Sequence, residues 1–247
     1  VVCLDPGHQT KGNPALEEIA PNSDKKKAKV TTGTRGVVTK KYESELMLEI
    51  ALKLKTSLES KGYKVIMTRT KNDVDISNKE RAIFANDNKA DVYIRLHADG
   101  SENKNAAGAS VLTSSPKNKY TTKVQKESEK FSKILLEEYV KATGAKNRGL
   151  IYRDDLTGTN WATVPNTLIE LGFMSNAEED KKFQELVEAR NKADQLISMT
   201  EKTLKENPDK VSEGDKKNIE DAIEELKKAK DGDDRGAIEA LSLIHIW

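Results

Sequence analysis

The sequence predicts an α/β fold, in which helices flank a twisted, mostly parallel sheet, followed by a C-terminal helical hairpin or small bundle. Short apolar runs rich in β-branched residues alternate with longer stretches whose apolar residues recur at helical spacing. A strand, a helix and a second strand at this spacing form a right-handed βαβ unit, which requires parallel strands. After about residue 177 the strand patterns stop and aromatic residues become rare, which predicts a helical tail.

The first expected strand is the apolar run at residues 1–4, which ends at Asp5-Pro6-Gly7 because proline cannot continue a central ladder. The polar residues 10–34 predict a long loop. A helix is expected from near Tyr42 to Gly62, a glycine suited to a helix C-terminus. The same two patterns predict further strands at 64–68, 91–96, 108–113, 148–153 and 167–171, and further helices around 78–86 and 123–142.

The tail is expected to hold one long helix that breaks at Asn207-Pro208 and a second helix capped by Ser212. A short third helix is expected at 233–241. These helices should pack mainly on each other, through Leu186, Ile197, Ile223 and Leu226. The start of the long helix, around Phe183, should partly cover the sheet, and the rest should leave the domain as an arm.

Composition excludes several classes of protein. Of the 247 residues 36% are hydrophobic and 34% charged, and no apolar run approaches the length of a membrane span. The net charge is +1, and the basic excess before residue 178 is too small and scattered to favour nucleic acid. Cys3, the only cysteine, is expected to pack as a small hydrophobe. Because the chain starts inside a strand without Met, we expect a fragment or a mature form.

Four residues carry the chemistry. His8 and His97 each follow an apolar strand, and the carboxyl ends of parallel strands are where open α/β sheets bind ligands. Glu43 lies in the first turn of a helix, where the helix dipole stabilises a carboxylate. Glu170 stands inside the apolar run TLIELGF, where an acid is costly unless it is paired or functional.

Two neutral imidazoles and a carboxylate are a common catalytic zinc set that leaves one position for water. A second carboxylate beside it serves as a general base. No HExxH or CxxC motif supports zinc here. The alternative is a generic α/β domain, with histidines bonded to the backbone and Glu43 solvated on its helix.

Four segments resemble the zinc-dependent N-acetylmuramoyl-L-alanine amidases that cut bacterial peptidoglycan: LDPGHQ, the helix beginning YESELMLEI, ADVYIRLHAD and VPNTLIELGFMSN. The resemblance covers residues 1 to about 180. It implies that His8, Glu43 and His97 bind one zinc ion and that Glu170 is catalytic. Glu45 is the rival for the middle ligand, and Glu43 is preferred from its register with Leu46.

The chain departs from the family pattern at Gln9, where a glycine is usual, and at Arg95 and Asp99 beside the second histidine. These changes concern fine specificity more than zinc binding. Arg69 and Arg81 match family arginines and are expected to form salt bridges between helix and sheet. Asn160 and Trp161 are candidates to line the substrate cleft, although Trp161 is equally suited to the core.

The tail is similar to the α-helical lid of DnaK-type heat-shock chaperones, from AEEDKKFQELVEARNKADQ to DRGAIEALS. This resemblance predicts an artificial or mis-assembled chimera. The expected division is an amidase catalytic domain at 1–177, a lid-like helical segment at 178–242 and an unassigned piece at 243–247. His245, in that last piece, is expected to have no role in the chemistry.

The resemblance implies an enzyme that cleaves the amide between N-acetylmuramic acid and the first L-alanine of the stem peptide, using zinc-activated water and Glu170 as the proton carrier. The implied partner is peptidoglycan, and the implied place of action is extracellular or the cell wall. A monomer without nucleic acid or a membrane span is expected. The alternatives are a zinc peptidase that cuts within the stem peptide, a non-catalytic wall-binding module and, from the tail alone, a chaperone-like interaction protein.

Overall fold

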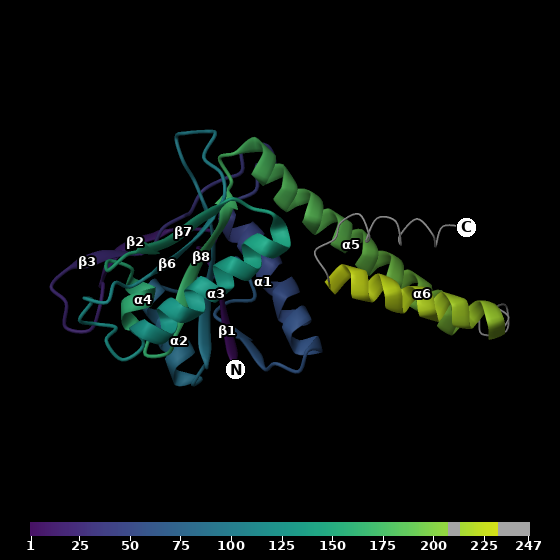
Figure 1. Cartoon of the computed structure of the whole chain (residues 1–247), viewed down its shortest axis with the longest axis horizontal. Coiled ribbons are helices and arrows are strands. Elements are labelled where there is room, and N and C mark those ends of the chain that lie inside the picture. The colour runs from purple at the N-terminus through teal and green to yellow at the C-terminus, as the bar shows by residue number, and fades with distance from the viewer. Residues whose placement is uncertain (207–212, 232–247) are drawn as a thin grey trace. The chain divides into compact units, whose positions relative to one another are not determined.

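The computed structural model describes residues 1–206 and 213–231. The chain divides into two compact units, Val1–Lys181 and Lys182–Trp247. The elements in chain order are β1 (Val2–Pro6), β2 (Asn13–Glu18), β3 (Lys26–Val30), α1 (Glu43–Ser60), β4 (Val65–Met67), α2 (Asn78–Asp87), β5 (Val92–Asp99), β6 (Ala109–Thr113), α3 (Gln125–Thr143), β7 (Asn147–Tyr152), α4 (Thr157–Trp161), β8 (Asn166–Phe173), α5 (Ala177–Glu206) and α6 (Glu213–Asp231) (Figure 1).

The first unit is built on a six-stranded sheet with the strand order β4-β1-β5-β8-β6-β7. The strands β4, β1, β5 and β8 run parallel, and only the β8–β6 pair is antiparallel. The parallel strands therefore end at one edge, where β1 and β5 carry the two candidate histidines. The predicted fold, a mostly parallel sheet with flanking helices, is confirmed.

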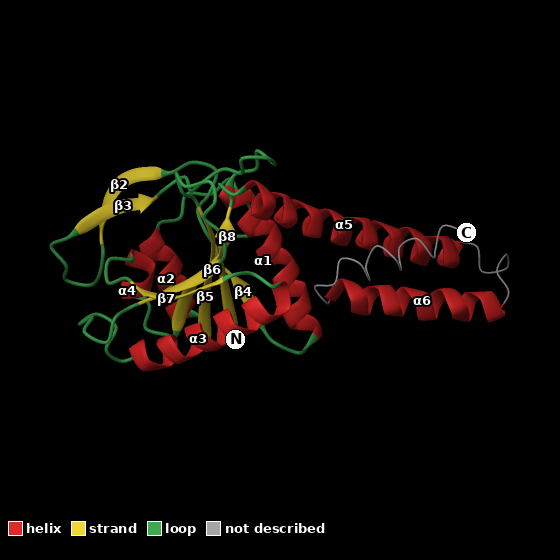
Figure 2. Ribbon diagram, turned by 45° about the horizontal axis from the view of Figure 1, so that its top comes forward, coloured by secondary structure: helices red, strands yellow, loops and turns green. Residues whose placement is uncertain are grey.

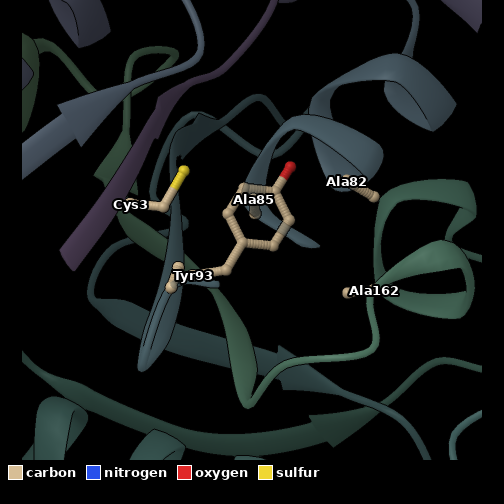
Figure 3. Packing of buried hydrophobic residues seen from close by; sticks show 6 residues of the cluster. Cys3, Ala82, Ala85, Tyr93 and Ala162 are labelled. Carbon is tan, nitrogen blue, oxygen red and sulfur yellow. The ribbon is translucent and has the colours of Figure 1, made fainter. Parts of the chain in front are cut away.

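Helices cover this sheet (Figure 2): α1 packs on β1, β4 and β5, and α3 packs on β6, β7 and β8. Cys3 of β1 and Tyr93 of β5 lie side by side and pack against Ala82 and Ala85 of α2 (Figure 3). The small alanines let α2 approach the sheet closely enough to bury the Tyr93 ring. Cys3 is fully buried, as the sequence predicts.

A fully buried carboxylate, Asp5, lies in β1. It accepts hydrogen bonds from Thr68 Oγ1 (2.6 Å), Arg81 Nη1 (2.8 Å), Tyr93 OH (2.9 Å) and Arg95 Nε (3.2 Å). Burial alone would raise the pKa of Asp5, but the two arginines and the hydrogen bonds hold it below its usual range. Since the folded-state pKa is depressed, the stabilisation is full above the unfolded-state pKa of about 4 and is lost as the pH falls.

Replacing Asp5 by asparagine should lower the free energy of unfolding by about 3–5 kcal/mol, because it leaves two buried arginines without their counter-charge. Urea denaturation at neutral pH measures this loss. The control is Asp24→Asn at an exposed position, which should change the free energy of unfolding by no more than about 0.5 kcal/mol. Equal effects of the two substitutions would contradict the assigned role of Asp5.

One prediction of local structure was wrong, and one short helix was missed. Residues 10–34 are not a simple loop, because β2 and β3 pair as an antiparallel hairpin. Only one residue in each strand is buried and the others are half-buried or exposed, so the hairpin lacks the apolar alternation by which strands are recognised. The short helix α4 was also not predicted, since five residues are too few to show a helical period.

In the second unit, α5 and α6 pack on each other through a small apolar cluster. Ala193, Ile197, Ile223 and Leu226 are buried in it, with Leu196, Leu204 and Ile219 packed against them. This agrees with the helical packing predicted from Ile197, Ile223 and Leu226. The side chain of Leu186, the third helix expected at 233–241 and the terminal piece 243–247 lie outside the described residues, and the arm-like course of the tail stays a prediction.

Among the helices that the structure describes, none has the length and apolar composition needed to cross a membrane.

Candidate active site

Two histidines and a glutamate meet at the carboxyl edge of the sheet. His8 follows β1, His97 lies in β5, and Glu43 is the first residue of α1. Glu43 Oε1 lies 3.1 Å from His8 Nε2 and 3.0 Å from His97 Nδ1, and these two nitrogens are 3.1 Å apart. In the part of the chain that the structure describes, this is the one group of three such side chains close enough to share a metal ion.

Backbone groups fix the orientation of these side chains. His8 Nδ1 lies 2.8 Å from the carbonyl oxygen of Thr31, in the segment that follows β3. The amides of Thr34 and Ala98 donate to the two carboxylate oxygens of Glu43, at 2.9 and 3.2 Å. The hairpin that the sequence did not predict thus leads directly into the segment that orients both His8 and Glu43.

The rival glutamate, Glu45, has a different task. Its Oε2 accepts a hydrogen bond from the backbone N–H of Tyr42 at 2.9 Å, as the third residue of a capping box does. Glu45 therefore caps α1, whereas Glu43 faces the histidines.

Two glycines make room for the cluster. A Cβ at Gly7 would lie 2.4 Å from the His97 ring, and a Cβ at Gly33 would lie 2.7 Å from Glu43 Oε2. Gly33 also has φ +83°, a conformation that side chains disfavour. Any larger residue at either position would push a member of the cluster aside.

The three side chains fit a zinc ion. The contact with the Thr31 carbonyl requires a proton on His8 Nδ1, so Nε2 is the ring nitrogen that can offer a lone pair to a metal ion. A proton on His97 Nδ1 can be donated to Glu43 Oε1 or to His8 Nε2, but not to both. Lone pairs of these three atoms therefore face each other. Burial lowers the pKa of His97 to about 4, so its ring is neutral at pH 7, as a metal ligand must be. Burial would raise the pKa of Glu43, but its hydrogen bonds with both histidines hold it low.

Glu170 lies beside this cluster. It is the β8 residue paired in register with His97, and its Oε2 is buried without a hydrogen-bond partner. Burial raises the pKa of Glu170 well above its usual value, and the charges of Glu43 and Asp99 raise it further, while Arg95 opposes them. A buried carboxyl with a raised pKa can hold and release a proton, which suits proton transfer.

One open cavity of about 620 Å³ contains all four candidate residues. Its other walls come from residues 31–34, residues 98–102 and Ser175. The cavity is therefore formed at the ends of β1, β5 and β8 and by the segment after β3. It is large enough to admit part of an extended substrate beside the His–Glu–His cluster.

A family model of N-acetylmuramoyl-L-alanine amidases matches residues 2–200 of this chain. The chain belongs to this amidase family. The predicted class of enzyme, a hydrolase of the amide that links the sugar and the peptide of cell-wall peptidoglycan, is thereby confirmed.

Solved structures agree with this result. The amidase resembles the N-acetylmuramyl-L-alanine amidase Ami1 from Mycobacterium smegmatis, with 26% identity, a TM-score of 0.65 and coverage of 74% of this chain and 86% of the other. The apo form of Ami1 from Mycobacterium abscessus matches with 27% identity, a TM-score of 0.66 and coverage of 74% and 87%. The N-acetylmuramoyl-L-alanine amidase from Clostridium difficile 630 matches with 27% identity and a TM-score of 0.58, and the match covers 74% of this chain and 84% of the other.

Asn160 and Trp161 are not among the residues that line this cavity. Asn160 is buried, where it accepts from Asn118 Nδ2 (2.8 Å) and donates to the Asp154 carbonyl (3.0 Å). Trp161 packs against the Cys3–Tyr93 cluster, and its Nε1 donates to the carbonyl of Glu18 (2.8 Å). Both side chains have structural partners, so we do not assign either to the substrate site. The alternative that Trp161 belongs to the core fits the structure.

The three residues that depart from the family pattern have different places in the amidase structure. Gln9 is buried and accepts from the Ile76 amide at 3.0 Å, so it braces a neighbouring loop. Arg95 points into the core toward Asp5. Asp99 alone of the three lines the cavity, where it can affect substrate choice.

Proposed function

We propose that the amidase is zinc-dependent, with one zinc ion held by His8, Glu43 and His97 and with Glu170 as the catalytic acid and base. The observation that carries the proposal is the convergence of three ligand atoms, 3.0–3.1 Å apart, beside an unpartnered buried carboxylate oxygen. Ligands and catalytic carboxylate come from four separate parts of the sequence, and all of them line one cavity.

The side chains divide the work. When bound, a zinc ion supplies Lewis acidity, which polarises a carbonyl and acidifies water. Glu170 accepts the proton of the attacking water and passes one to the departing amine, and its raised pKa suits both steps. The contacts of His8 with Thr31 and of Glu43 with Thr34 hold the ligands in place.

The substrate is peptidoglycan, and the bond cut is the amide between the lactyl group of N-acetylmuramic acid and L-alanine. This assignment supports an enzyme that works outside the cell or in the cell wall.

We further propose that the catalytic domain is residues 1–177 and that the helices after it belong to a lid-like segment without a part in the chemistry, as the sequence resemblance implies. The family match extends into this segment, to residue 200.

Products formed from a purified muropeptide of known structure test the proposal. The expected products are an intact stem peptide with a free N-terminal alanine and a disaccharide with a free lactyl carboxylate, identified by mass spectrometry. Shortened peptides that stay attached to the sugar would instead support a peptidase that cuts within the stem. Binding without any cleavage would support a wall-binding module.

A further inference from the structure

Arg69, which follows β4, is almost entirely buried. Its Nε donates to the carbonyl of Pro6 at 3.0 Å, and its Nη2 donates to the carbonyl of Gly7 at 2.9 Å. These two carbonyls belong to the turn that carries His8. Arg69 is thus bound to the backbone immediately before one proposed zinc ligand.

The same guanidinium also reaches a second ligand-bearing segment. Arg69 Nη2 donates to the carbonyl of Ser44 at 2.7 Å, and Ser44 directly follows Glu43 at the start of α1. One rigid planar group therefore joins the turn of His8 to the first turn of the helix that presents Glu43. A guanidinium carries several N–H donors in one rigid plane, whereas a lysine ammonium is a point charge on a flexible stem.

The turn needs this support. His8 has φ +59°, a left-handed conformation that costs free energy for a residue with a Cβ. Arg81 Nη2 donates to the His8 carbonyl at 2.9 Å, so it holds the turn from the other side. Arg81, however, makes no hydrogen bond to the Glu43 helix in the described residues, so of the two arginines only Arg69 joins the His8 turn to the start of α1.

The sequence predicted salt bridges for Arg69 and Arg81. Arg81 pairs with Asp5, but in the described part of the chain Arg69 has no carboxylate within ion-pair distance. Its hydrogen bonds are to backbone carbonyls and one asparagine side chain. Arg69 is a buried cation that hydrogen-bonds to the backbone of two ligand-bearing segments. These contacts indicate that it fixes the geometry of the site rather than pairing with a charge.

We propose that Arg69 is a positioning residue that sets the distance between His8 and Glu43 and thereby the affinity of the site for zinc. The proposal rests on the zinc site proposed above. Removing the donors of Arg69 lets the His8 turn and the start of α1 move independently. Part of the free energy of zinc binding is then used to bring the two ligands together. The affinity for zinc therefore falls, although all three ligands are still present.

The test compares the zinc affinity of the wild-type full chain with that of Arg69→Met, Arg69→Lys and Leu136→Ala. Affinity is measured by competition with a chromophoric chelator well below each unfolding temperature, with folding checked by circular dichroism. Arg69→Met should bind zinc about 10- to 100-fold more weakly, as expected for the loss of a group that orients metal ligands. Arg69→Lys, which keeps the charge and some donors, should lie between it and the wild type.

Leu136→Ala is the control for a purely structural effect. Leu136 is a buried residue of α3, so its truncation should lower the unfolding temperature but leave the zinc dissociation constant unchanged. Wild-type affinity in Arg69→Met, or an equal loss in Leu136→Ala, would overturn the proposal. Should Arg69→Met fail to fold, wild-type affinity in Arg69→Lys overturns it as well. Absence of zinc binding by the wild type would instead defeat the zinc site itself.

Discussion

Glu170→Gln should lower the rate of muropeptide hydrolysis by about 10²- to 10⁴-fold, the usual range for the loss of a general acid or base. Glutamine keeps the size of the side chain but cannot take up the proton of the attacking water. Zinc content should stay at the wild-type level, because Glu170 is not part of the His–Glu–His triangle. Single-turnover kinetics and metal analysis of the same preparation measure both quantities.

Glu102→Gln is the matched control, because Glu102 is another carboxylate that lines the cavity. It should change the rate far less than Glu170→Gln does. If Glu170→Gln retains wild-type turnover, or loses its metal, the role assigned to Glu170 is wrong.

Removal of the metal should abolish hydrolysis altogether, and added zinc should restore it. Without the ion, the carbonyl of the substrate is not polarised, and two imidazoles and a carboxylate are left facing each other. Activity is measured after dialysis against a chelator and again after titration with zinc.

His8→Ala serves as the comparison in this experiment. With one ligand missing, zinc should restore little or no activity at concentrations that saturate the wild type. Full activity in metal-free wild-type protein would exclude the zinc assignment.

The sheet was predictable because its strands carry the plainest signals in the chain. The runs around Cys3 and Tyr93 are apolar and buried, and each is followed by a turn or by a polar residue at the sheet edge. The hairpin β2–β3 buries only one residue in each strand, so its sequence looks like that of a loop. Such strands are specified by their pairing with each other rather than by burial, and a single sequence does not reveal that pairing.

The candidate site could be predicted only in part, for a physical reason. His8, Glu43, His97 and Glu170 carry recognisable side-chain chemistry at the ends of recognisable elements. The groups that orient them are largely backbone atoms, such as the carbonyl of Thr31 and the amide of Thr34, and any residue type supplies those. The task of Arg69 was misjudged for the same reason, because its partners in the fold are carbonyl groups rather than acids.

The most direct test of the proposed metal centre is the zinc content of purified protein, measured by mass spectrometry of the metal together with the protein concentration. We expect about one zinc ion per chain in the wild type. Glu45→Ala should keep this zinc, because Glu45 only caps α1, whereas Glu43→Ala should lose it. Zinc retained by Glu43→Ala and lost by Glu45→Ala, or no zinc in the wild type, would contradict the proposed metal centre.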